Sequence, residues 1–70
     1  MRDFRKRYKE FTDWMVDFLK DKTEYQQLLR ILEENRKEKI RFVEDLFRMW
    51  LNDRDKIDWL FRHEMLKRGL

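Results

Sequence analysis

The spacing of apolar residues over the first twenty positions constrains the fold more than any other feature of the sequence. Apolar side chains recur there every three or four residues, as Phe4, Tyr8, Phe11, Met15 and Phe18, with Leu19 beside the last. This is the period of an α-helix with one buried face, whereas a half-buried strand alternates at every second residue. The spacing therefore predicts a helix whose aromatic stripe, from Phe4 to Phe18, belongs to a core.

The same helical spacing returns in two further stretches, 25–51 and 57–66. Pro is absent, and the only Gly occupies the penultimate position. No linker, internal repeat or low-complexity segment divides the 70 residues, so we predict a single domain, residues 1–70. Its expected fold class is all-α, a small helical bundle. Because the chain has no Cys, neither a disulfide nor a thiolate metal site supports it, and the packing of its aromatic residues has to.

Polar residues with capping propensity mark the ends of the expected helices. Asp3 precedes the first helix as a candidate N-cap, and Thr23 with Gln26 three residues later has the pattern of a capping box. A short polar turn places Asp55 before the last helix as its N-cap, and Gly69 follows that helix as its stop. These signals predict helices at about 4–20, 24–51 and 56–68.

The middle stretch forms either one helix, 24–51, or two, because polar residues at 33–39 interrupt its apolar pattern. At 100° per residue, the apolar residues on both sides of the interruption lie in one angular sector, which favours one helix. They are Leu28, Leu29 and Leu32 before it and Ile40, Val43, Phe47 and Trp50 after it. The alternative is a second capping box, Asn35 with Glu38, which breaks the middle helix near Asn35 and gives four helices.

The choice between one and two middle helices has a consequence for association. A continuous helix is longer than its antiparallel neighbours, and the simplest cover for its free part is a second copy of the chain. Two helices instead predict a compact monomer. A continuous helix also places Arg36 and Lys39 on the core stripe, where each has to snorkel, pair with a carboxylate or lie where the bundle opens. These two residues are the weakest point of the one-helix interpretation.

Charged residues make up 47% of the chain and apolar residues 41%. This apolar content is too high for an ordinary disordered segment. No apolar run approaches the roughly 18–20 residues of a membrane span, and the first residues lack the pattern of a signal peptide. We therefore expect a soluble chain that is not exported, that is cytoplasmic if it is a natural protein, and that does not bind membranes.

The residues of common catalytic and metal sites are missing. His63 is the only histidine, and Cys and Ser are absent, which excludes a conventional Ser or Cys triad and a zinc site of several histidines. His63 lies off the centre of the last apolar stripe, so we expect a solvated surface residue; a haem or metal ligand in a symmetric dimer is the alternative. Adjacent acids such as Glu33 and Glu34 diverge by about 100° on a helix. We predict no enzyme, no cofactor and no metal site.

Basic residues gather in two places: Arg2, Arg5, Lys6, Arg7 and Lys9 near the start, and Arg36, Lys37, Lys39 and Arg41 in the middle. The first group lies at a helix start, where cations oppose the helix dipole, and this placement suggests contact with phosphate groups. Acids are interspersed with both groups, however, and the net charge is only +3. A solvated face with many ion pairs is the simpler interpretation, and nucleic-acid binding through the first helix is the alternative.

Four apolar residues lie away from the main stripes, namely Phe42, Met49, Trp59 and Leu66. Large apolar side chains that gather on a surface form interface patches, in which Trp and Phe are frequent anchors. We therefore predict these four as candidate interface residues, with a broader core as the alternative. The expected partner is a second copy of the chain, as a homodimer, or another helical protein.

Two-faced helices without active-site residues predict a non-enzymatic structural or protein-interaction bundle whose activity is folding and self-association. The absence of Ala and Ser is unusual for a natural domain, and we interpret it as the mark of a designed sequence. The lack of Gly at the helix junctions argues against that origin, because idealised designs commonly use it there. The alternative function is a small basic nucleic-acid-binding module.

Overall fold

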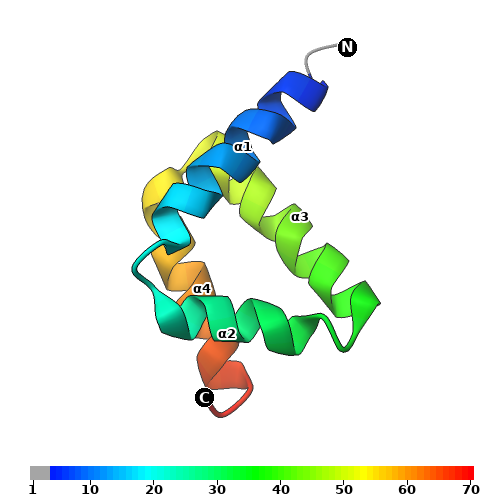
Figure 1. Cartoon of the computed structure of the whole chain (residues 1–70), viewed down its shortest axis with the longest axis vertical. Helices are drawn as coiled ribbons and strands as arrows, with labels where there is room; N and C mark the ends of the chain where they lie inside the picture. Colours follow the sequence, from blue (N-terminus) through cyan, green and yellow to red (C-terminus); the bar gives the residue numbers. More distant parts are fainter. Residues whose placement is uncertain (1–3) are drawn as a thin grey trace.

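The computed structural model describes residues 4–70, which form four α-helices joined by short turns (Figure 1). The helices are α1 (Phe4–Leu19), α2 (Thr23–Leu32), α3 (Arg36–Asn52) and α4 (Ile57–Lys67), and a 3₁₀ turn, η1 (Arg54–Lys56), precedes α4. These residues contain no strand, so the predicted all-α helical bundle is confirmed. The first helix begins at residue 4 as expected and ends one residue earlier, and the last helix begins one residue later and ends one residue earlier than expected.

The middle of the chain is broken, and the prediction of one helix over 24–51 is wrong. Asn35 adopts an extended backbone (φ −128°, ψ 97°), and its side-chain oxygen accepts the N–H of Glu38 at 3.3 Å. A short polar side chain that satisfies a free N–H at a helix start stabilises a new N-terminus there. The alternative of four helices is therefore the correct one, although Glu38 does not return the bond as a full capping box would.

Two other predicted caps do not form. Thr23 is the first residue of α2 rather than its cap, and the amide of Gln26 donates to the carbonyl of Leu19 at the end of α1. Asp55 lies within η1 and makes no capping bond to α4. The predicted Asp3 cap lies outside the described residues.

The predicted stop at Gly69 is confirmed. Gly69 has φ +78°, a left-handed conformation that glycine adopts without a steric penalty. Its N–H donates to the carbonyl of Leu66, and the N–H of Leu70 donates to that of Met65. This pair of bonds is the Schellman arrangement, which satisfies carbonyls at the end of α4.

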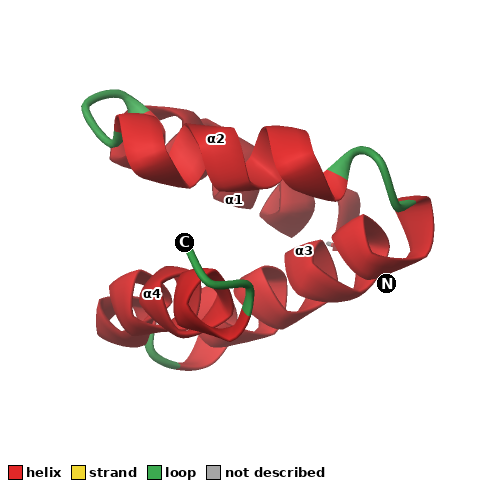
Figure 2. Ribbon diagram, turned by 90° about the horizontal axis from the view of Figure 1, so that it is seen from below, coloured by secondary structure: helices red, strands yellow, loops and turns green. Residues whose placement is uncertain are grey.

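Helix α3 packs against each of the other three helices, and α1 also packs against α2. Figure 2 shows α2 along one side of the molecule, α3 and α4 along the other, and α1 behind them. The radius of gyration is 12.2 Å, about 1 Å larger than expected for a compact domain of this length. The molecule measures 39 × 24 × 18 Å and is therefore elongated. In Figure 1 the start of α1 extends away from the point where α1 crosses the end of α3.

Phe61 is the centre of the core, where it contacts an aromatic ring from each of the other helices. Its ring stacks on Tyr25 of α2 at 4.6 Å between centroids, meets Phe42 of α3 edge-on at 5.3 Å, and lies 6.0 Å from Phe18 of α1. Phe61 is fully buried. Aromatic pairs at these separations contribute about 0.5–1.5 kcal/mol each beyond the burial of their area.

The break changes which face of α3 enters this core. The buried residues of α3 are Phe42, Leu46 and Trp50, which follow one another at four-residue intervals. The stripe expected for a continuous helix, centred near Val43 and Phe47, lies about 80° further around α3 at 100° per residue. Ile40, which belongs to that stripe, is 51% exposed. The new helix start therefore leaves part of the expected apolar stripe on the surface.

The Asn35 cap is testable by substitution. Asn35→Ala removes the side-chain acceptor for the Glu38 N–H, so we expect the free energy of unfolding to fall by about 1 kcal/mol. Asn35→Asp keeps an acceptor and should lose far less, and Glu34→Ala, at an exposed neighbour in the same turn, serves as the control. Urea unfolding followed by circular dichroism measures all three. Equal stability of Asn35→Ala and the unmodified chain would contradict the capping role.

Candidate interaction surface

A groove runs between the first half of α1 and the outer face of α3, and we call it the α1–α3 groove. Its volume is about 1010 Å³. Its apolar lining consists of Phe4 and Tyr8 from α1 and Ile40, Val43, Phe47 and Leu51 from α3. Ile40 and Leu51 are 51% and 45% exposed, and Phe4 is 65% exposed. The groove thus gathers large apolar side chains that the fold of a single chain does not cover.

Aromatic contacts join the α1 side of the groove to its α3 side. The ring of Phe47 meets Phe4 edge-on at 5.8 Å, Tyr8 at 5.4 Å and Phe11 at 5.2 Å. Phe11 is buried and also contacts Trp50, so it anchors this part of α1 to the core. The predicted assignment of the whole first stripe to the core is therefore wrong at its beginning, because Phe4 and Tyr8 line the groove. The later members of that stripe do pack in or against the core.

Charged side chains surround the apolar lining. Lys39 pairs with Glu33 at 3.0 Å, and Arg48 pairs with Asp45 at 3.2 Å. Arg36 and Glu44 also line the groove, and neither has an ion-pair partner among residues 4–70. Lys39 and Arg36, which a continuous helix would have placed on the core stripe, therefore lie at the open side of the bundle instead.

The four residues predicted for an interface divide into two pairs. Phe42 is 5% exposed, and Met49 packs against the core, so both belong to the broader core that was the alternative. Trp59 and Leu66 lie on the exposed side of α4, 57% and 76% exposed. The predicted stripe, which leaves Phe42 out, assumes a continuous helix over 24–51. In the separate helix α3, Phe42 lies on the buried face.

The basic residues of α1 divide between two sides of the helix. Arg5, Lys6 and Arg7 are exposed, and at 100° per residue Arg5, Lys6 and Lys9 lie within about 100° of one another, whereas Arg7 points away from them. Lys9 is paired with Asp13 at 3.0 Å, and Arg2 lies outside the described residues. Three of the predicted phosphate contacts therefore share a face of α1, and an acid partly neutralises that face.

His63 is exposed, as expected, and its ring stacks on Trp59 at 5.0 Å between centroids. Within residues 4–70, no group of three or more His, Cys, Asp or Glu side chains is placed to hold a metal ion. The adjacent acids Glu33 and Glu34 therefore belong to no such group.

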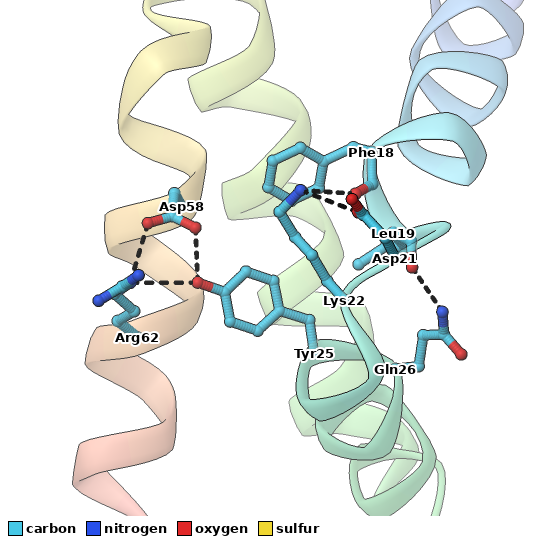
Figure 3. Close-up of polar contacts among 8 residues, drawn as sticks. All are labelled: Phe18, Leu19, Asp21, Lys22, Tyr25, Gln26, Asp58 and Arg62. Atoms are coloured by element: carbon cyan, nitrogen blue, oxygen red, sulfur yellow. Dashed lines mark hydrogen bonds and ion pairs between the residues drawn. The ribbon is translucent and has the colours of Figure 1, made fainter.

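A polar cluster joins α2 to α4 (Figure 3). The hydroxyl of Tyr25 donates to Asp58, and the Nε of Arg62 donates both to that hydroxyl at 3.2 Å and to Asp58 at 2.9 Å. Burial of the ring and the bond to Asp58 raise the pKa of Tyr25 above its usual value of 10.0. The cluster holds the Tyr25 ring in its stacked position against Phe61.

A second polar link joins the start of α3 to the end of α4. Arg68 donates to Glu38 and to Glu64, the latter at 2.9 Å. The bond from Arg68 lowers the pKa of the Glu38 carboxyl below its usual 4.5. This link uses the Glu38 side chain that a full capping box would have directed back to Asn35. Both polar clusters thus support the positions of the helices rather than line the groove.

Ile40, Val43 and Leu51 line the groove, although the sequence does not mark them as interface residues. Their spacing alone indicates a buried face, and the periodicity over 24–51 assigns Ile40 and Val43 to the core. The sequence signal that could have identified them is the Asn35 cap. A helix that starts anew after Asn35 can turn a different face towards the core than a continuous helix would. Phe4 and Tyr8 become groove residues because they pack on Phe47 of α3 with one side and leave the other side exposed.

Comparisons of this chain with protein-family models, with curated proteins and with solved structures find no match. No helix in residues 4–70 combines the length and apolar character that crossing a membrane requires.

The raised pKa of Tyr25 predicts a loss of stability at high pH. A group whose pKa is higher in the folded chain stabilises the fold below its unfolded value, here 10.0, and this contribution disappears as the pH rises through the folded value. Tyr25→Phe should lower stability at pH 7 by about 0.5–1.5 kcal/mol and should show a smaller decline above pH 10. Urea unfolding in steps from pH 8 to pH 11.5 measures this, with Tyr8→Phe as the control. Parallel curves for Tyr25→Phe and the unmodified chain would show that the cluster does not perturb Tyr25.

Proposed function

We propose that this chain is a non-enzymatic protein-interaction domain that self-associates through the α1–α3 groove. The observation that carries the proposal is the set of apolar side chains that this groove leaves exposed, from Phe4 to Leu51. Apolar patches of this kind on a small domain are typical of surfaces that bind another protein. A helix in such a groove would bury residues that alternate by three and four positions, which is a common mode of peptide and helix recognition.

The origin of the proposed self-association differs from the one expected for a long middle helix. That expectation rested on a continuous helix with an uncovered end, and the break at Asn35 removes it. The proposal rests instead on the outer face of α3, which the break turns away from the core. Nucleic-acid binding through the first helix has weaker support, because Arg7 points away from Arg5 and Lys6 around α1 and Asp13 pairs with Lys9 on their face.

Sedimentation equilibrium between 1 and 300 µM tests the proposal. We expect the unmodified chain to dimerise in this range and Ile40→Asp to remain monomeric, because the dimer would bury an unpaired carboxylate. Val16→Asp is the matched control: Val16 is also a β-branched residue, is 72% exposed and lies outside the groove. It should dimerise like the unmodified chain.

Leu66→Asp separates the groove from the exposed face of α4, where Trp59 and Leu66 lie. If the groove is the interface, Leu66→Asp dimerises normally. A strictly monomeric unmodified chain at 300 µM would overturn the proposal, and so would equal loss of dimer in Val16→Asp and Ile40→Asp. Circular dichroism of each variant establishes that its helices remain folded.

A further inference from the structure

We infer that the occupant of the α1–α3 groove is the α3 helix of a second copy, running antiparallel about a two-fold axis that passes between residues 45 and 46. This inference rests on the proposed self-association and adds its geometry. In an isologous dimer, residue i of one copy contacts residue j of the other and j contacts i. When two copies of one helix pair antiparallel, the sequence positions of any two residues that face each other add up to the same value. With the axis between residues 45 and 46, that value is close to 91.

The apolar residues of the outer face of α3 match under this rule. Ile40 lies opposite Leu51 of the second copy, and Val43 lies opposite its Phe47. All four line the groove. Apolar residues near the start of α3 in one copy thus face apolar residues near the end of α3 in the other copy. Phe4 and Tyr8, which pack beside Phe47, would extend the apolar contact towards Val43 of the second copy.

The charges of the face match under the same rule. Glu44, which has no ion-pair partner among residues 4–70, lies opposite Arg48 of the second copy. Both residues lie on the same flank of the face, away from α1, because they are separated by one helical turn. A two-fold axis perpendicular to the helices keeps this flank on the same side in both copies, so Glu44 and Arg48 meet across the interface twice.

The distribution of charge along α3 favours the antiparallel direction. Residues 36–41 carry four cations and one acid, whereas residues 44–52, the rest of α3, carry two acids and one cation. Antiparallel pairing keeps the two basic starts of α3 apart, whereas parallel pairing places them together. The helix dipoles also oppose one another in the antiparallel arrangement. Charge complementarity therefore favours a second copy in this orientation over a parallel dimer.

Charge reversal tests the contact between Glu44 and Arg48. We expect Glu44→Arg alone and Arg48→Glu alone each to raise the dimer dissociation constant at least tenfold, because each homodimer then opposes like charges at two places. An equimolar mixture of the two single variants should associate within about threefold of the unmodified chain, since each then opposes opposite charges in the heterodimer. The mixture is decisive because any repulsion between positions 44 and 48 within one chain remains in it.

Spin labels measure the direction of the pairing. The chain has no Cys, so Lys37→Cys and Arg41→Cys each give one labelled site per copy. Both residues are exposed on α3. With the axis between 45 and 46, moving the label from 41 to 37 increases the separation of the two labels along the helix axis by about 12 Å, at 1.5 Å rise per residue in each helix, and the distance between them by somewhat less. A parallel pairing leaves the two distances nearly equal.

The outcomes separate this inference from the proposed function. A dimer in sedimentation with nearly equal spin-label distances at positions 37 and 41 overturns the antiparallel geometry and leaves self-association standing. A dimer in which the mixed charge variants fail to associate overturns the contact between Glu44 and Arg48. A monomeric unmodified chain overturns both proposals. The inference is supported if the distance between the two spin labels is longer at position 37 than at position 41 and if the mixture of the two charge variants associates.

Discussion

The packing of three aromatic rings against Phe61 is the interaction on which the rest of this structure depends. None of the four helices exceeds 17 residues, and helices this short are marginal on their own in water. Each becomes stable by burying a face against the others, and α1, α2 and α3 supply Phe18, Tyr25 and Phe42 to the same ring. The polar bonds of Tyr25 to Asp58 and Arg62 then fix the orientation of one of these rings (Figure 3).

This arrangement requires the chain to turn at Asn35. A continuous helix would carry α3 away from α2 in a straight line, and Tyr25 and Phe42 could not both reach Phe61. The turn brings both helices to the same centre, and it directs Phe42, Leu46 and Trp50 inward. The cost is an exposed apolar face on the other side of α3. The fold of the core and the proposed interaction surface therefore have one cause.

The sequence predicts the helical class, the outer helices and the Gly69 stop because these follow from local spacing and backbone preference. It predicts the continuity of the middle helix wrongly, since good helix formers and an apparently continuous stripe outweigh a single capping residue when residues are judged locally. The competing Asn35 cap is visible in the sequence, but its success depends on the tertiary contacts of α2 and α3 with α4. The groove follows from that same non-local choice, so Ile40 and Leu51 could not be assigned to a surface from periodicity alone.

The most direct test of this account is the backbone conformation between residues 30 and 40 in solution. Secondary chemical shifts of Cα carbons report it residue by residue. The account predicts helical shifts up to Leu32, a loss of helical shift at Asn35, where φ is −128° and ψ is 97°, and helical shifts again from Arg36. Uninterrupted helical shifts from Thr23 to Asn52 would contradict it, because α3 would then present a different face to Phe61 and the groove would not exist.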